Sequence, residues 1–121
     1  MTETTEIMSF DLKKFRIRIH KSTIHTLGDP KYIHLLVNPE KRTVAVRAYN
    51  GTSPGKDAHR IKQSLMNSDD SYEIYSRPFV TKLCEVVGGL ETECGYRISG
   101  VIVPSEKMAV YSLKTITRIE P

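Results

Sequence analysis

The sequence has no tryptophan, only two cysteines and no long hydrophobic run, and each shortage excludes a class of protein. Cys84 and Cys94 form no C-x-x-C motif and have no histidine pair at zinc-ligand spacing, so we expect reduced thiols and no metal ion. The longest apolar run, Ile33–Val37, spans five residues, whereas a transmembrane helix needs about 20. The first residues, MTETTEIMSFDLKK, contain no apolar signal region. These absences predict a cytoplasmic protein without a membrane partner.

Motifs of common enzymes are missing as well. The sequence contains neither the G-x-S-x-G motif of serine nucleophiles nor the H-E-x-x-H motif of zinc proteases. The segment Gly51–Asp57 approaches a phosphate-binding loop, but it is one residue short and places an acid where a hydroxyl would bind magnesium. Cys84 lies in an apolar stripe, which favours a packed side chain over a nucleophile. We therefore expect a non-enzymatic protein that holds no cofactor.

The composition is that of an ordinary globular protein with an uneven distribution of charge. The chain has 121 residues, of which 39% are hydrophobic and 26% are charged, and this length suits a single domain. Its net charge of +4 conceals a contrast along the chain. The net charge is −3 over residues 1–11, +9 over residues 12–62 and −2 over residues 63–121. Any function that depends on positive charge is therefore expected in the first half.

The first half of the chain, residues 12–49, has the pattern strand, helix, strand, strand. Apolar and basic residues alternate from Lys14 to His20, as expected for a strand with one buried face. Gly28 is suited to end the following helix in the left-handed conformation. The four predicted elements are a strand at Lys14–His20, a helix capped by Ser22 or Thr23, and strands at Tyr32–Val37 and Thr43–Tyr49.

The second half, residues 71–119, repeats this pattern after a connector at residues 50–70, in which Asp57–Met66 is expected to form helical turns. Tyr32–Tyr49 aligns with Tyr96–Leu113 without a gap and with four identities in 18 positions. The predicted elements are a strand at Tyr72–Tyr75, a helix capped by Ser76 with the apolar stripe Phe79, Leu83, Val86 and Val87, strands at Tyr96–Val103 and Met108–Leu113, and a last segment at Thr115–Ile119.

These patterns predict one α+β domain over residues 12–119, preceded by a flexible leader at residues 1–11. Two βαββ units would form a pseudo-duplicated curved sheet or barrel with short covering helices. The alternative is that two such units occur by chance in an α+β protein of this size.

Residues 16–28, RIRIHKSTIHTLG, resemble the AbrB-type transition-state regulators, a swapped-hairpin DNA-binding family. The family pattern is Arg, Ile, any residue, Ile, Pro, Lys and then a short helix that ends in Leu-Gly. The matching positions are Arg16, Ile17, Ile19, Lys21, Leu27 and Gly28. Two positions depart from the pattern, because His20 stands in place of Pro and Asp29-Pro30 in place of Gly-Asp. The resemblance covers residues 16–49 and implies a DNA-binding transcription regulator.

The strand at Lys14–His20 carries the candidate binding surface. If its apolar residues face the core, its basic side chains recur every 6–7 Å or so on the other face, a spacing similar to that of phosphates along one DNA strand. The candidate nucleic-acid-binding residues are Lys14, Arg16, Arg18, Lys21 and Arg47. One alternative is a structural or protein-interaction module, which would form a homo-oligomer and keep this face solvated. Another is a small-ligand-binding or enzymatic protein with its site between the two halves.

Overall fold

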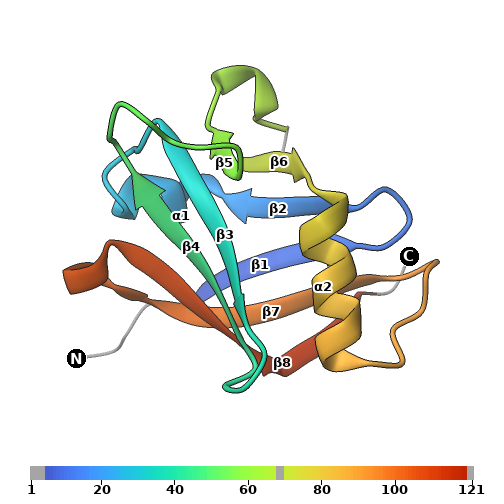
Figure 1. The fold of residues 1–121 in the computed structure, drawn as a ribbon. Helices are drawn as coiled ribbons and strands as arrows, with labels where there is room; N and C mark the ends of the chain where they lie inside the picture. Colours follow the sequence, from blue (N-terminus) through green and yellow to red (C-terminus); the bar gives the residue numbers. More distant parts are fainter. Residues whose placement is uncertain (1–4, 68–69, 120–121) are drawn as a thin grey trace.

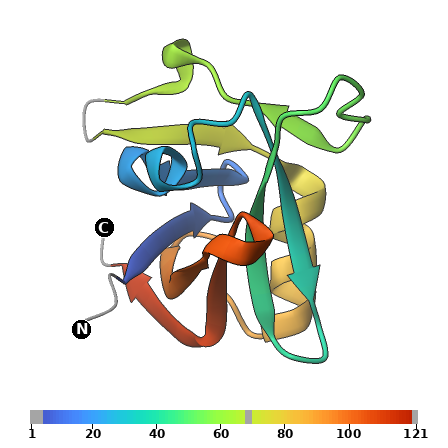
Figure 2. The same ribbon diagram turned by 90° about the vertical axis from the view of Figure 1, so that its left-hand side faces the viewer.

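The computed structural model describes residues 5–67 and 70–119, which form one curved antiparallel sheet with two short helices (Figure 1). The sheet has eight strands in the order β5-β3-β4-β8-β7-β1-β2-β6, and it curls around a single core into a nearly closed barrel (Figure 2). The elements are β1 (Glu6–Asp11), β2 (Arg16–His20), α1 (Lys21–Thr26), β3 (Tyr32–Asn38), β4 (Thr43–Tyr49), β5 (Ala58–Arg60), β6 (Ser71–Tyr75), α2 (Arg77–Val87), β7 (Gly95–Val103) and β8 (Met108–Ile119), with one-turn 3-10 helices η1 (Gln63–Leu65) and η2 (Pro104–Glu106).

Strand β1 corrects the prediction of a flexible leader at residues 1–11. Its residues pair with β2 on one side and with β7 on the other, so it lies inside the sheet. Met8 and Phe10 alternate with exposed or half-buried residues and are buried in the core. The strand was missed because the inward position before them is Glu6, an acid in a polar stretch. Residues 1–4 of the expected leader lie outside the described residues.

The strands and the helix predicted for the first half are present, but the helix begins differently. Its cap is His20, whose Nδ1 accepts a hydrogen bond from the backbone N–H of Ser22 at 3.1 Å. Thr23 is not the cap because it lies inside the helix as its third residue, where its fully buried side chain donates a hydrogen bond to Glu6 Oε2 at 2.7 Å. Gly28 follows the helix with a φ of 91°, a conformation that glycine adopts without strain.

The second half also has its expected elements. The Ser76 hydroxyl caps α2 by accepting a hydrogen bond from the N–H of Phe79 at 3.3 Å. In the predicted stripe of this helix Phe79 and Leu83 are buried, and Val86 and Val87 are half-buried. Strand β8 runs through the expected last segment as one continuous strand. In the connector, β5 takes the place of helical turns at Ala58–Arg60, because these residues pair with the edge of β3.

Candidate nucleic-acid interface

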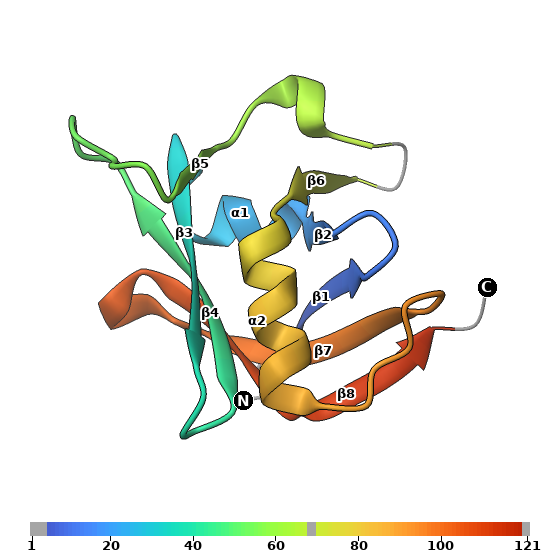
Figure 3. The ribbon, with the colours of Figure 1, turned by 45° about the vertical axis from the view of Figure 1, so that its right-hand side comes forward.

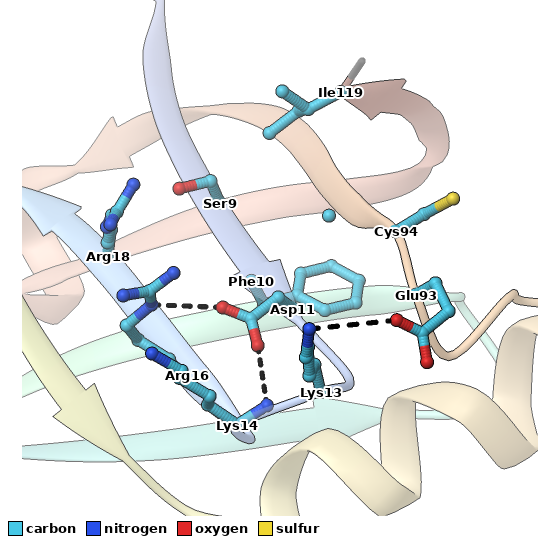
Figure 4. A pocket seen from close by; sticks show the side chains of 11 residues that line it. Ser9, Phe10, Asp11, Lys13, Lys14, Arg16, Arg18, Glu93, Cys94 and Ile119 are labelled. Carbon is cyan, nitrogen blue, oxygen red and sulfur yellow. Dashed lines mark hydrogen bonds and ion pairs between the residues drawn. The ribbon is translucent and has the colours of Figure 1, made fainter. Parts of the chain in front are cut away.

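The outward face of β2 carries two arginines that are held by carboxylates. Arg16 Nε lies 3.0 Å from Asp11 Oδ2, and Arg18 Nε lies 2.8 Å from Glu73 Oε2 (Figure 4 shows the first pair). Arg16 Nη1 also approaches Glu73 Oε2 at 3.8 Å. The alternation of β2 is as predicted, since Ile17 is fully buried between them. The arginines therefore reach the predicted face, but each has an acidic partner there.

These contacts shift the pKa of Arg16 and that of Glu73. Partial burial acts to lower the pKa of Arg16, but its hydrogen bond to Asp11 and the nearby carboxylate charges raise it. Burial likewise acts to raise the pKa of Glu73, yet hydrogen bonds from Asn67 and Arg18, together with the arginine charges, hold it below its ordinary value. The charged forms of these residues thus stabilise one another across the ladder between β2 and β6.

The lysines at the two ends of β2 have a different environment. Lys14 and Lys21 are exposed, and neither ammonium group forms an ion pair within residues 5–67 and 70–119. The backbone N–H of Lys14 donates to Asp11 Oδ1 at 2.8 Å, which fixes the turn before β2. Lys13 lies 3.8 Å from Glu93 (Figure 4). A cavity of about 260 Å³ lies along this face and is lined by Lys14, Arg16 and Arg18 but not by Lys21 or Arg47.

Arg47 lies on a different surface. It is an exposed residue of β4, and strands β8, β7 and β1 separate β4 from β2 in the sheet. It lines an open groove of about 800 Å³, which we call the α2–β3 groove. This groove is lined by residues 34–37 of β3, Arg47, residues 54–57 and His59 around the start of β5, Tyr75, and residues 76, 78, 79 and 82 at the start of α2. The structure therefore divides the predicted binding residues between two surfaces.

Two histidines contribute to the α2–β3 groove. The His34 Nε2 atom lies 3.2 Å from the Pro54 carbonyl oxygen, which can only accept, so Nε2 donates and fastens the loop after β4 to β3. Burial lowers the pKa of His59, the neighbouring His34 lowers it further, and Asp57 opposes this shift. His59 is thus a neutral side chain at neutral pH, and the positive charge of the groove comes from its lysines and arginine.

The acidic partners of the β2 face were not predicted. Asp11 lies in the stretch interpreted as a leader, and Glu73 lies 55 residues from Arg18. The sequence does contain a strand pattern around Glu73, but that pattern does not show that β6 pairs with β2. The alternation of both strands would have placed Arg18 and Glu73 on the same face once this pairing was known.

The described part of the chain contains no cluster of three or more His, Cys, Asp or Glu side chains suited to a metal ion. Within the same residues, no helix is long and apolar enough to cross a membrane. Comparison of the chain with protein-family models, curated proteins and solved structures gives no match, so the resemblance to AbrB-type regulators stays a prediction.

Proposed function

We propose that the protein is a non-enzymatic DNA-binding regulator that contacts backbone phosphates through the outward face of β2. The observation that carries this proposal is the clustering of five cationic residues on one strand and its two ends. They are Lys13, Lys14, Arg16, Arg18 and Lys21. Because Ile17 and Ile19 must be buried in the core, the arginines between and beside them are held on the outside.

The acidic partners leave these arginines able to bind phosphate. Arg18 uses only Nε for Glu73, so neither of its Nη groups has a partner among the described residues. Arg16 uses Nε and Nη1 and retains Nη2. A guanidinium fixed through Nε presents its remaining N–H groups in a defined direction, which favours contact with a phosphate. Since the carboxylates also reduce the local net charge, most of the salt-dependent affinity should come from Lys14 and Lys21.

Duplex binding at two salt concentrations tests this function. Fluorescence anisotropy with a labelled duplex of mixed sequence should show a steep loss of affinity between about 50 and 200 mM salt. The double variant Lys14→Gln/Lys21→Gln should weaken binding and reduce the slope of log K against log salt by about two. The control Lys62→Gln/Lys114→Gln removes the same charge from exposed positions elsewhere. Equal losses in both variants, or no binding at the lower salt concentration, would rule out this interface.

We also propose that the two βαββ units, β2-α1-β3-β4 and β6-α2-β7-β8, arose by duplication. Support comes from the burial pattern of β4 and β8. The shift that places Ala45 on Val110 also places Val44 on Ala109 and Val46 on Tyr111, and these four residues are buried.

The buried positions favour the same alignment of the units. The shift that joins Ala45 to Val110 also places buried Ile33 on buried Ile98. The gapless alignment of Tyr32 with Tyr96 differs from this alignment by one residue. It places buried Ile33 on exposed Arg97. A one-residue slip moves each side chain of a strand to the opposite face. Alanine substitutions of Ile33 and Ile98 should accordingly destabilise the protein to a similar extent, and a large inequality would oppose the duplication.

A further inference from the structure

The edge of β3 is only partly covered by a neighbouring strand. Strand β5 pairs with Tyr32–His34 only. The edge from Leu35 to Asn38 therefore has no strand beside it within the described residues. Uncovered strand edges present backbone N–H and C=O groups that can pair with another extended chain. The α2–β3 groove runs along this part of β3, since Leu35, Leu36 and Val37 line it.

The backbone of Val37 is directed toward this open side. The N–H of Ile61 donates to the carbonyl of Lys31 at 2.8 Å, which shows that Lys31 faces β5. Successive residues of an antiparallel strand direct their hydrogen-bonding groups to alternate sides, so those of Ile33, Leu35 and Val37 face the same way as those of Lys31. The N–H and C=O of Val37 have no backbone partner in the described part of the chain.

Helix α2 forms the opposite wall of the groove. It stands beside β3 on the side where β5 pairs (Figure 3), and its first turns contribute Pro78, Phe79 and Lys82. Tyr75 precedes this helix and is 57% exposed, and Leu36 is also exposed. The groove volume of about 800 Å³ lies within the range of binding sites, and the open edge of four residues spans about 13 Å. The groove thus combines an open strand edge with apolar and aromatic walls.

The charges that line the groove are mainly positive. Arg47 comes from β4, Lys56 from the loop before β5 and Lys82 from α2, whereas Asp57 is the single acidic residue among the lining residues. Lys82 lies 3.9 Å from Glu85, but both side chains are more than half exposed, and a surface pair of this kind is weak. A partner with acidic side chains would be attracted to the groove, and one with basic side chains would be repelled.

We propose that the α2–β3 groove binds an extended acidic segment of a partner polypeptide, which adds to the edge of β3 as a further strand. The backbone of the segment pairs with Val37, its apolar side chains contact exposed Leu36, and its carboxylates lie near Lys56 and Lys82. A nucleic acid would satisfy the charges but has no peptide backbone to continue the ladder. This inference does not rest on the DNA-binding proposal, because no residue of β2 lines the groove, although the groove reaches the neighbouring strand at Tyr75, which pairs with Arg16.

The test uses two labelled octapeptides that differ only in charge, one alternating Glu and Val and the other alternating Lys and Val. Fluorescence anisotropy should detect binding of the glutamate peptide and at least tenfold weaker binding of the lysine peptide. The double variant Lys56→Glu/Lys82→Glu should weaken binding of the glutamate peptide at least tenfold. The control Lys62→Glu/Lys114→Glu makes the same charge change at exposed positions outside the groove and should leave binding within twofold of the unmodified protein.

Hydrogen exchange of the Val37 amide tests the strand pairing itself. A saturating concentration of the glutamate peptide should slow its exchange at least tenfold, since a new hydrogen bond protects it. The variant Lys14→Gln/Lys21→Gln should bind the peptide as the unmodified protein does, which separates this proposal from DNA binding. The proposal is overturned by unchanged exchange at Val37, by equal binding of the two peptides, by no binding at about 1 mM peptide, or by an oligothymidine that binds the groove in place of the peptide.

Discussion

The two βαββ units place very different residues at the same position of their helices. The third residue of α1 is Thr23, which donates a hydrogen bond to Glu6 in the interior, whereas the third residue of α2 is Phe79, which packs against the core. Helix α1 has six residues and α2 has eleven. The longer helix is held by a wide apolar face, and the shorter one depends more on a single buried polar contact. One topology can therefore be stabilised in two ways.

The units also differ in charge, and side chains of opposite charge meet in the ladder between β2 and β6. Basic Arg18 of β2 faces acidic Glu73 of β6 in the ladder that joins the first unit to the second. Part of the positive charge of the first half thus contributes to attraction between the units. Among residues 5–67 and 70–119, only the cations that form no ion pair there, such as Lys14 and Lys21, remain fully available to a ligand.

The largest effect is expected from shortening a core residue of the longer helix. Leu83 is fully buried in α2, and Leu83→Ala should lower the free energy of unfolding by about 2–5 kcal/mol, because it leaves a cavity. The corresponding change beside α1, Leu27→Ala, should cost less, since Leu27 is the C-cap that follows the helix and is slightly exposed. Urea denaturation gives both values. A greater loss for Leu27→Ala would show that the short helix is the more strongly packed one.

A smaller loss of stability is expected when the buried polar contact of α1 is removed. Thr23→Val keeps the shape of the side chain but leaves the Glu6 carboxylate without its 2.7 Å hydrogen bond, so we expect a loss of about 1–3 kcal/mol in urea denaturation. The control is Thr26→Val, an exposed position of the same helix. If the two substitutions lower the free energy of unfolding by the same amount, the buried hydrogen bond of Thr23 is not a feature that distinguishes the stabilisation of α1 from that of α2.

The attraction between the units should appear as a dependence of stability on pH. The pKa of Glu73 is lower in the folded protein than its ordinary value, so its contribution is present above about pH 4.5 and is lost as the pH falls through the folded pKa. Glu73→Gln should therefore be less stable than the unmodified protein at pH 7, by about 1 kcal/mol. The difference should shrink below pH 4 or so. Thermal unfolding across this range measures it, and a difference independent of pH would contradict the assignment.

The smallest effect concerns the helix caps. Ser76→Ala removes the acceptor for the N–H of Phe79 and should cost about 1 kcal/mol. His20→Ala, at the start of the shorter helix, should cost less. The capping hydrogen bond of the exposed His20 imidazole competes with water more than that of the half-buried Ser76 hydroxyl does. The two variants can be compared by circular dichroism during thermal unfolding. The reverse order would indicate that α1 needs its cap more than α2 does.

Local patterns in the sequence predicted most of the elements but not their assembly. Alternation and glycine identified both helices and the strands of each unit, and the predicted cap was correct for α2 at Ser76 but wrong for α1, which is capped by His20. Strand β1 was missed because Glu6 occupies an inward position, and β5 was missed because its pairing with β3 has no local pattern. The outward position of Arg18 was correct, but its partner Glu73 belongs to a strand that is brought alongside only by the fold.

The proposed contact of DNA with the β2 face can be observed through amide chemical shifts during titration with a short duplex. At low salt, we expect the largest changes at Lys14 and Lys21 and along β2, with Val37 in the α2–β3 groove unaffected. Changes confined to the groove, or no changes at all, would contradict the account.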